Sequence, residues 1–138
     1  MERSKIAEAI CEVLYTGHAA GLLASVVDDK AKWALASGTS PQQLASGPPV
    51  GAKCFQGFAG LSALATFCRN ALQIVSGDMT GCVIRGDCLF VFGTVRLKPS
   101  GAKEPPETSF AGKLIWGGVQ IISGEFRIMW PFPLEAGC

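Results

Sequence analysis

The C-terminal half of the chain consists of strand-like segments that are apolar on both faces. From Thr80 onward, β-branched and aromatic residues predict four strands, over residues 80–85, 87–98, 109–122 and 125–132. The breaks between them are residues 85–87, residues 99–107 and Ser123-Gly124. In the second strand both alternating sets of side chains are apolar, whereas an antiparallel sheet with one wet face alternates apolar and polar residues. We therefore expect a sheet covered on both sides, by helices on one face and by a second subunit on the other.

The N-terminal half changes to helical periodicity. Apolar residues recur every three to four positions over residues 2–16, 18–27 and 58–75, which predicts three helices. A short strand is expected over residues 31–36, and the glycines and prolines of residues 37–53 predict a loop. The order is helix, helix, strand, helix and four strands, which is an α+β domain. At 138 residues, we expect a single domain spanning residues 1–138.

Charge and hydropathy exclude several classes of protein. With 12 Lys and Arg against 11 Asp and Glu, the net charge of +1 provides no basic surface for nucleic acid. The longest apolar run without a charge, residues 54–68, is too short to span a bilayer. Glu8 and Glu12 interrupt the first segment, which is therefore not the apolar region of a signal peptide. We expect a cytoplasmic protein that does not bind membranes.

The cysteines do not form a recognisable metal or redox motif. No two of the six have the C-x-x-C spacing, and His18 is the single histidine, so no metal site and no cofactor are expected. A cytoplasmic location also disfavours disulfides. We expect Cys138 to be an exposed thiol, and the buried, hydrophobe-like positions to be Cys11, Cys68, Cys82 and Cys88.

Four short motifs, in this order and spacing, resemble the SnoaL-like and ketosteroid isomerase-like branch of the nuclear transport factor two-like superfamily. They are Tyr15-Thr16-Gly17-His18, Val27-Asp28-Asp29 followed by Trp33, Phe55-Gln56-Gly57, and Ser123-Gly124-Glu125-Phe126. The resemblance implies a cone-shaped, strongly curved mixed or antiparallel sheet wrapped around three N-terminal helices, with an apolar pocket inside. It also implies a homodimer formed through the outer face of the sheet.

The ketosteroid isomerase residues are not matched in this sequence. That mechanism uses a carboxylate base and an oxyanion hole made of a tyrosine and a protonated acid. Counting from the shared motifs, the base falls at Ala34, the tyrosine at Ile10 and the acid near Trp116.

The arginine and two aspartates of the family's epoxide hydrolases are also unmatched. They fall at about Phe92, Thr94 and Pro131. The segment Arg85-Gly86-Asp87 contains an Arg-x-Asp sequence, but it lies in a predicted turn. The catalytic residues are left unassigned.

Two titratable side chains, His18 and Arg127, each have two possible roles. His18 is an exposed residue at a helix start or a catalytic base, and Arg127 is an anchor for a ligand or a solvated residue near a strand end. The family resemblance implies certain pocket positions, and strand residues that alternate in step with them share the same face. The resulting candidates for the pocket wall are Tyr15, Trp33, Phe92, Thr94, Trp116, Gln120, Arg127 and Met129.

Three functions are compatible with these observations. The first is the binding of a small apolar molecule in the cone. The second is a cofactor-free isomerase, cyclase, dehydratase or hydrolase that acts on a small hydrophobic substrate. The third is a dimeric interaction module whose cone is filled by its own side chains.

Overall fold

The computed structural model describes residues 2–17, 21–37, 53–98 and 107–128. It is an α+β fold with two α-helices, one short 3₁₀-helix and six strands in these ranges. In chain order they are α1 (Arg3–Thr16), η1 (Gly21–Ser25), β1 (Val27–Ser37), β2 (Lys53–Gln56), α2 (Gly57–Asn70), β3 (Ile74–Arg85), β4 (Cys88–Leu97), β5 (Glu107–Gly117) and β6 (Gln120–Ile128). None of the described helices is long and apolar enough to cross a bilayer.

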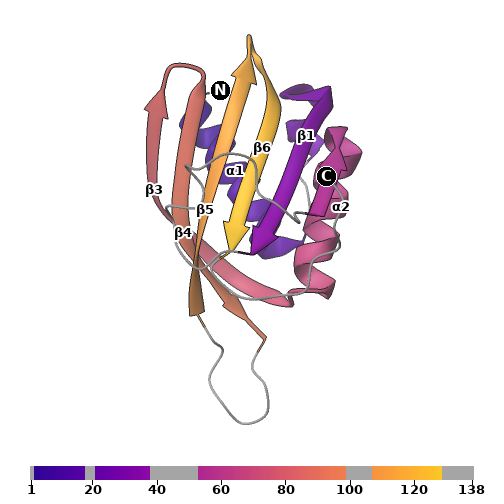
Figure 1. Cartoon of the computed structure of the whole chain (residues 1–138), viewed down its shortest axis with the longest axis vertical. Helices are drawn as coiled ribbons and strands as arrows, with labels where there is room; N and C mark the ends of the chain where they lie inside the picture. The colour runs from indigo at the N-terminus through magenta and orange to yellow at the C-terminus, as the bar shows by residue number, and fades with distance from the viewer. Residues whose placement is uncertain (1, 18–20, 38–52, 99–106, 129–138) are drawn as a thin grey trace.

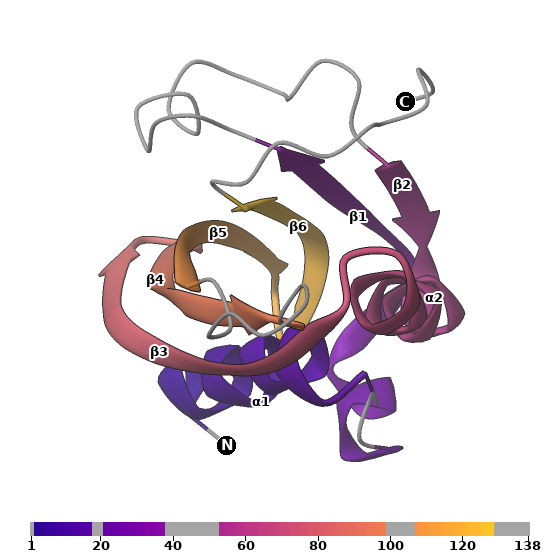
Figure 2. The ribbon, with the colours of Figure 1, turned by 90° about the horizontal axis from the view of Figure 1, so that it is seen from below.

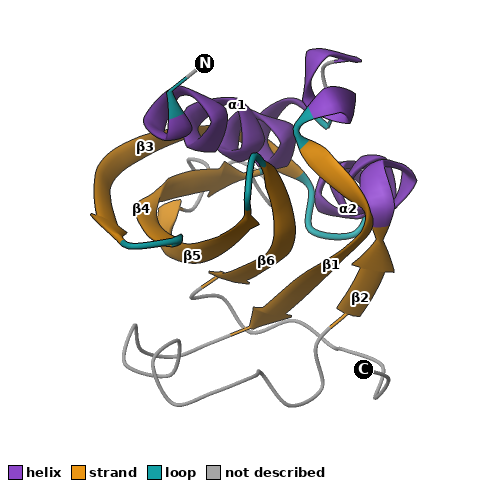
Figure 3. Cartoon of the chain, turned by 90° about the horizontal axis from the view of Figure 1, so that it is seen from above, coloured by secondary structure: helices purple, strands orange, loops and turns teal. Residues whose placement is uncertain are grey.

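The six strands form one mixed sheet in the order β2-β1-β6-β5-β4-β3. Strands β1 and β6 are parallel, and the other neighbours are antiparallel. The sheet is strongly curved, and α1 and α2 lie on its concave side (Figures 1, 2 and 3). This confirms the predicted α+β class and the mixed, curved sheet.

The three N-terminal α-helices expected from the sequence are not confirmed. In place of a helix over residues 18–27, the described part contains only η1, because Val27 already pairs with Ile121 of β6 and begins β1. The helix expected over residues 58–75 ends at Asn70. Gln73 then adopts a left-handed backbone with φ of 56°, which no helix continues, and Ile74 begins β3.

Several strand boundaries also differ from the prediction, and β1 and β3 begin earlier than expected, at Val27 and Ile74. Residues 53–56 form β2 against β1, within and just after the segment expected to be a loop. The β5–β6 turn lies at Gly118 and Val119, not at Ser123-Gly124, because Gly118 supplies the positive φ of 68° that a tight turn needs. Gly124 lies inside β6, directly paired with Leu114 of β5 and Trp33 of β1.

The two faces of the sheet are apolar but unequally covered. Along β4, Leu89, Val91 and Val95 are fully buried on the concave face. The alternate residues, Phe90 and Phe92, point to the outer face and are half-buried and exposed, respectively. Within one chain, therefore, the concave face of β4 is covered more completely than its outer face.

Aromatic rings on the concave face lie over glycines of the neighbouring strands. The directly paired residues are Trp33 with Gly124, Phe110 with Gly93, and Phe126 with Gly112. A Cβ at Gly112 would lie 2.7 Å from the Phe126 ring, and one at Gly124 would overlap the Trp33 ring. The glycines therefore give the rings the space in which they pack flat against the sheet.

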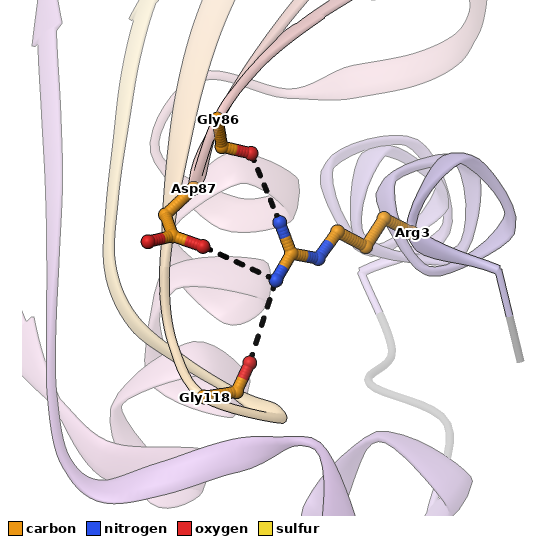
Figure 4. Close-up of polar contacts among 4 residues, drawn as sticks. All are labelled: Arg3, Gly86, Asp87 and Gly118. Carbon is orange, nitrogen blue, oxygen red and sulfur yellow. Dashed lines mark hydrogen bonds and ion pairs between the residues drawn. The ribbon is translucent and has the colours of Figure 1, made fainter.

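An arginine at the start of α1 binds the β3–β4 turn and the β5–β6 turn (Figure 4). The Arg3 guanidinium donates to Gly86 O at 3.1 Å and to Gly118 O at 3.4 Å, and its Nη2 lies 3.4 Å from Asp87 Oδ1. It also stacks 5.0 Å from the centre of the Trp116 ring. Asp87 therefore lies in the β3–β4 turn, as predicted for residues 85–87, and there it pairs with Arg3 of α1.

Substituting Gly124 tests the packing of these rings. We expect Gly124→Ala to lower the free energy of unfolding by about 1–3 kcal/mol, because its methyl group overlaps the Trp33 ring in a buried site. Gly21→Ala is the matched control, since no atom lies within 4 Å of a Cβ there, and its effect should stay within about 0.5 kcal/mol. Equal effects in urea denaturation would contradict this packing.

Candidate functional site

Side chains of the protein itself fill the space between the sheet and α1. Trp33, Phe110 and Phe126 are at most 1% exposed, and they form one core cluster with Ile10 and Leu14 of α1. The Trp33 indole is satisfied there, because its Nε1 donates to Gly57 O at 3.0 Å. A ligand cannot enter this part of the cone without displacing the core.

The large open cleft of the described residues lies at one end of the cone. It has a volume of about 960 Å³ and is bounded by the C-terminal ends of α1 and α2, the first half of β3 and the end of β4. It is lined by Glu12, Tyr15, Thr16, Arg69, Asn70, Gln73, Ile74, Val75, Ser76, Gly77 and Lys98. A smaller hollow of about 270 Å³ adjoins it, shares Glu12, Tyr15 and Gly77, and adds Glu8, Asp78 and Met79.

Tyr15 forms the wall between the cleft and the smaller hollow. Its ring occupies the space that a Cβ on Gly77 would need and meets Phe110 edge to face, with ring centres 5.9 Å apart. Its hydroxyl is buried and has no oxygen or nitrogen as a hydrogen-bond partner. The group beside it is the Cys11 thiol, and sulfur is a weak partner.

Burial keeps the Tyr15 hydroxyl and the nearby thiols protonated. It is the main cause that raises the pKa of Tyr15 far above its usual value, followed by the nearby Cys11 and Asp78. Burial likewise raises the pKa of Cys11 to about 12 and that of Cys68 to about 12. Tyr15 is therefore a hydrogen-bond donor at neutral pH, and the two thiols are not nucleophiles.

The cysteines confirm one expectation and correct another. Cys11 and Cys68 are buried and free, as predicted, while Cys82 and Cys88 are free but half-buried. Cys54 on β2 is disulfide-bonded, which corrects the expectation that the protein contains no disulfides. Within the described ranges, no cluster of three or more His, Cys, Asp or Glu residues could hold a metal ion.

Two cationic side chains reach the cleft from different elements. Arg69 ends α2, and its stem packs on Gly17, where a Cβ would lie 2.7 Å from Arg69 Cδ. Lys98 follows β4, and its backbone N–H donates to Gln73 O at 2.8 Å. Gln73 itself holds the left-handed backbone, a strained conformation that is enriched at binding and active sites.

Among the predicted pocket residues, the structure places Tyr15 in the cleft and several others elsewhere. Trp33 and Trp116 belong to the packed core. Phe92 and Thr94 lie on the outer face of β4 and not in the pocket where they were predicted. A count from a motif that is wrong by one residue exchanges the two faces of a strand.

The remaining predicted residues are also away from the cleft. Gln120 lies next to the β5–β6 turn, and its Nε2 donates to Ser25 O at 3.2 Å. Arg127 is 7% exposed and lies beside Ala36 and Ala111 on the outer side of β6. Met129 and His18 lie outside the described residues.

No sequence motif predicts a site role for Arg69, Lys98 or Gln73. They lie far apart in the chain, and no local motif contains more than one of them. Gly17 directly follows the helix predicted over residues 2–16, and its αL conformation, with φ of 69°, ends α1 there. Gly17 has a second role, which is to make room for the Arg69 stem. This contact joins α1 and α2, so it cannot be predicted from the spacing of residues along the sequence.

Comparison with known proteins identifies the fold and no closer relationship. No family model and no curated protein matches the sequence. A putative isomerase from Rhodopseudomonas palustris matches with a TM-score of 0.60 and 15% identity, over 93% of this chain and 90% of that one. A putative SnoaL-like polyketide cyclase from Mesorhizobium loti matches with a TM-score of 0.57 and 18% identity, over 91% and 98%.

A third solved structure shows the same fold. It is a protein from Catenulispora acidiphila with a ketosteroid isomerase-like fold, in complex with trimethylamine. Its TM-score is 0.61 at 13% identity, over 99% of this chain and 90% of that one. The chain therefore has the fold of the SnoaL-like and ketosteroid isomerase-like branch, as the sequence motifs suggested.

Because Tyr15 is the single tyrosine, its ionisation can be followed directly by tyrosinate absorbance. Its raised pKa means that the unfolded chain loses this proton first, so stability falls as the pH rises above about 10, by up to about 1.4 kcal/mol per pH unit. We expect tyrosinate to form only together with the loss of circular dichroism. Tyrosinate appearing near pH 10 in a folded protein would contradict the buried hydroxyl.

Proposed function

We propose that the protein binds a small organic molecule in the cleft between the C-terminal ends of α1 and α2. The observation that carries this proposal is the cleft itself, whose volume of about 960 Å³ is at the upper end of the usual range for small-molecule sites. It combines an aromatic wall with convergent polar groups, which is the usual make-up of such sites.

The wall of the cleft contains apolar surface that the fold leaves open to solvent. Val75, which lines the cleft together with Ile74 and Tyr15, is 53% exposed. Covering this surface with an apolar ligand is favourable by about 25 cal/mol for each Å² removed from water. The strained Gln73 backbone in the same wall supports a site that is maintained at some cost to stability.

The solved structures with the same fold support a small-molecule ligand. One is described as a putative isomerase, one as a putative polyketide cyclase, and one holds trimethylamine. Another is a designed protein from work on diverse pocket structures. These four structures are less than 20% identical to this chain, so they support a likeness of fold alone. The kind of ligand is inferred from the cleft of this chain.

A cofactor-free enzyme is the second candidate, and the Tyr15 hydroxyl favours it. A buried hydroxyl without an oxygen or nitrogen partner can donate to an oxygen of a substrate that develops negative charge. Glu12 and Asp78 line the adjoining hollow and provide carboxylates for proton transfer. The residues at the ketosteroid isomerase positions, Ala34, Ile10 and Trp116, cannot supply that chemistry.

A second copy of the chain is the partner that we propose for the outer face of the sheet. This face carries the outer apolar patch, which consists of Val83, Phe90, Phe92, Ile115 and Ile122. Large exposed apolar patches on one face of a protein mark interaction sites. Lys113 of β5 is paired with Glu125 of β6 at the patch. Under a two-fold axis, Lys113 of one copy can face Glu125 of the other.

The cytoplasmic location and the absence of nucleic-acid and membrane partners remain predictions. The net charge of +1 supports the absence of nucleic acid. The disulfide at Cys54 weighs against a reducing compartment, since structural disulfides persist mainly in oxidising ones. A thiol count that rises by two when denatured protein is reduced would confirm the disulfide and count against the predicted cytoplasmic location.

Filling the cleft tests the proposed binding. We expect ligand-observed NMR to show that 2-naphthylmethanol, a neutral apolar probe, binds the wild type, and that Val75→Trp weakens this at least tenfold by occupying the cleft. Val119→Trp is the control, because Val119 is 85% exposed at the β5–β6 turn, away from the cleft. No binding to the wild type, or equal binding to Val75→Trp, would contradict the proposal.

The homodimer is tested by placing a charge in the outer apolar patch. We expect the wild type to elute at twice the chain mass of 14.5 kDa at micromolar concentration, and Phe92→Glu to elute as a monomer. Val119→Glu adds the same charge outside the patch and should remain dimeric. A monomeric wild type would contradict the homodimer and leave the cleft proposal standing.

A further inference from the structure

We infer that the ligand of the cleft is a small organic anion, a carboxylate with a flat apolar body, whose charged end binds Arg69 and Lys98. This inference rests on the proposed function, because it assigns the chemical class of the molecule that the same cleft takes.

The charged groups of the two cations of the cleft form no ion pair with the described residues. Arg69 and Lys98 are exposed, and neither forms an ion pair within 4.0 Å in the described part of the chain. The cations that do form ion pairs, Arg3 and Arg96, lie outside the cleft. Two unpaired cations that approach one cleft from α2 and β4 constitute a binding site for an anion.

Arg69 is positioned by packing and not only by its place on α2. Its Cβ and Cδ atoms occupy the space that a side chain at Gly17 would fill, so its stem lies against the end of α1. A guanidinium on a held stem loses less conformational freedom on binding, and its planar donors match a carboxylate. This arrangement favours a planar carboxylate over a spherical anion.

The charges around Tyr15 orient the ligand. Glu8 and Asp78 line only the small hollow, and Arg69 and Lys98 line only the large cleft, while Glu12 borders both beside Tyr15. A carboxylate is therefore repelled from the hollow and attracted to the outer part of the cleft. Its apolar body then lies over Tyr15 and Val75, the apolar surface that the fold leaves uncovered.

A neutral ligand of the same shape binds less well. It covers the same apolar surface but lacks the negative charge that Arg69 and Lys98 attract. A cationic ligand is repelled by Arg69 and Lys98. The cleft thus ranks three matched probes: 2-naphthoate first, 2-naphthylmethanol second and 2-naphthylmethylamine last.

Isothermal titration calorimetry of the full chain with these three probes tests the inference. We expect 2-naphthoate to bind the wild type at least tenfold more tightly than 2-naphthylmethanol. In the double variant Arg69→Gln and Lys98→Gln, the naphthoate affinity should fall about tenfold, to that of the alcohol, while the alcohol affinity stays unchanged. The matched control removes two exposed cations outside the cleft, Arg85→Gln with Lys32→Gln, and should bind like the wild type.

The outcomes separate this inference from the proposed function. If the alcohol binds as tightly as naphthoate, or if the double variant keeps the preference for naphthoate, the anion assignment is wrong and the cleft still binds small molecules. If none of the probes binds the wild type, both fail. Salt provides a test without variants: raising the ionic strength should weaken naphthoate binding severalfold and leave alcohol binding unchanged. A naphthoate affinity that salt does not alter would overturn the inference even if the double variant does not fold.

Discussion

The structure depends on the contact between aromatic rings and glycines on the concave face of the sheet. Trp33, Phe110 and Phe126 each lie over a glycine of the neighbouring strand, and Tyr15 of α1 lies over Gly77 in the same manner. A side chain at these glycines would lift the ring from the sheet and push α1 outward. The curvature that brings both α-helices onto one face (Figure 2) therefore requires glycine at these positions.

The same contact determines where a ligand can bind. Because the rings fill the cone, the cleft of about 960 Å³ lies where they end, between the C-terminal ends of α1 and α2. Tyr15 is the last ring of the series, and beyond it the wall changes from apolar to charged. The position of the cleft and its mixed lining thus follow from the packing of the core.

The sequence predicted the elements that repeat a local pattern and missed those that depend on distant partners. The period of two along β4 and the stripe of α1 were sufficient for the α+β class, and the family resemblance implied the curved sheet. The parity of Phe92 and Thr94 was wrong because a count of residues from a motif cannot detect an offset of one. Gly124 looked like a turn because only the contact with Trp33 explains a glycine within a strand. Of the candidate site, Tyr15 was identified from the sequence, whereas Arg69 and Lys98 meet only after folding.

The central claim is that the cone is filled by its own aromatic side chains and that the ligand site is the cleft beyond Tyr15. The most direct measurement is a crystal structure of the protein with 2-naphthoate. We predict that the naphthalene ring lies against Val75 and Tyr15, with Trp33, Phe110 and Phe126 in their present packing. Density for naphthoate between those three rings and α1 would contradict this account of the fold and the site.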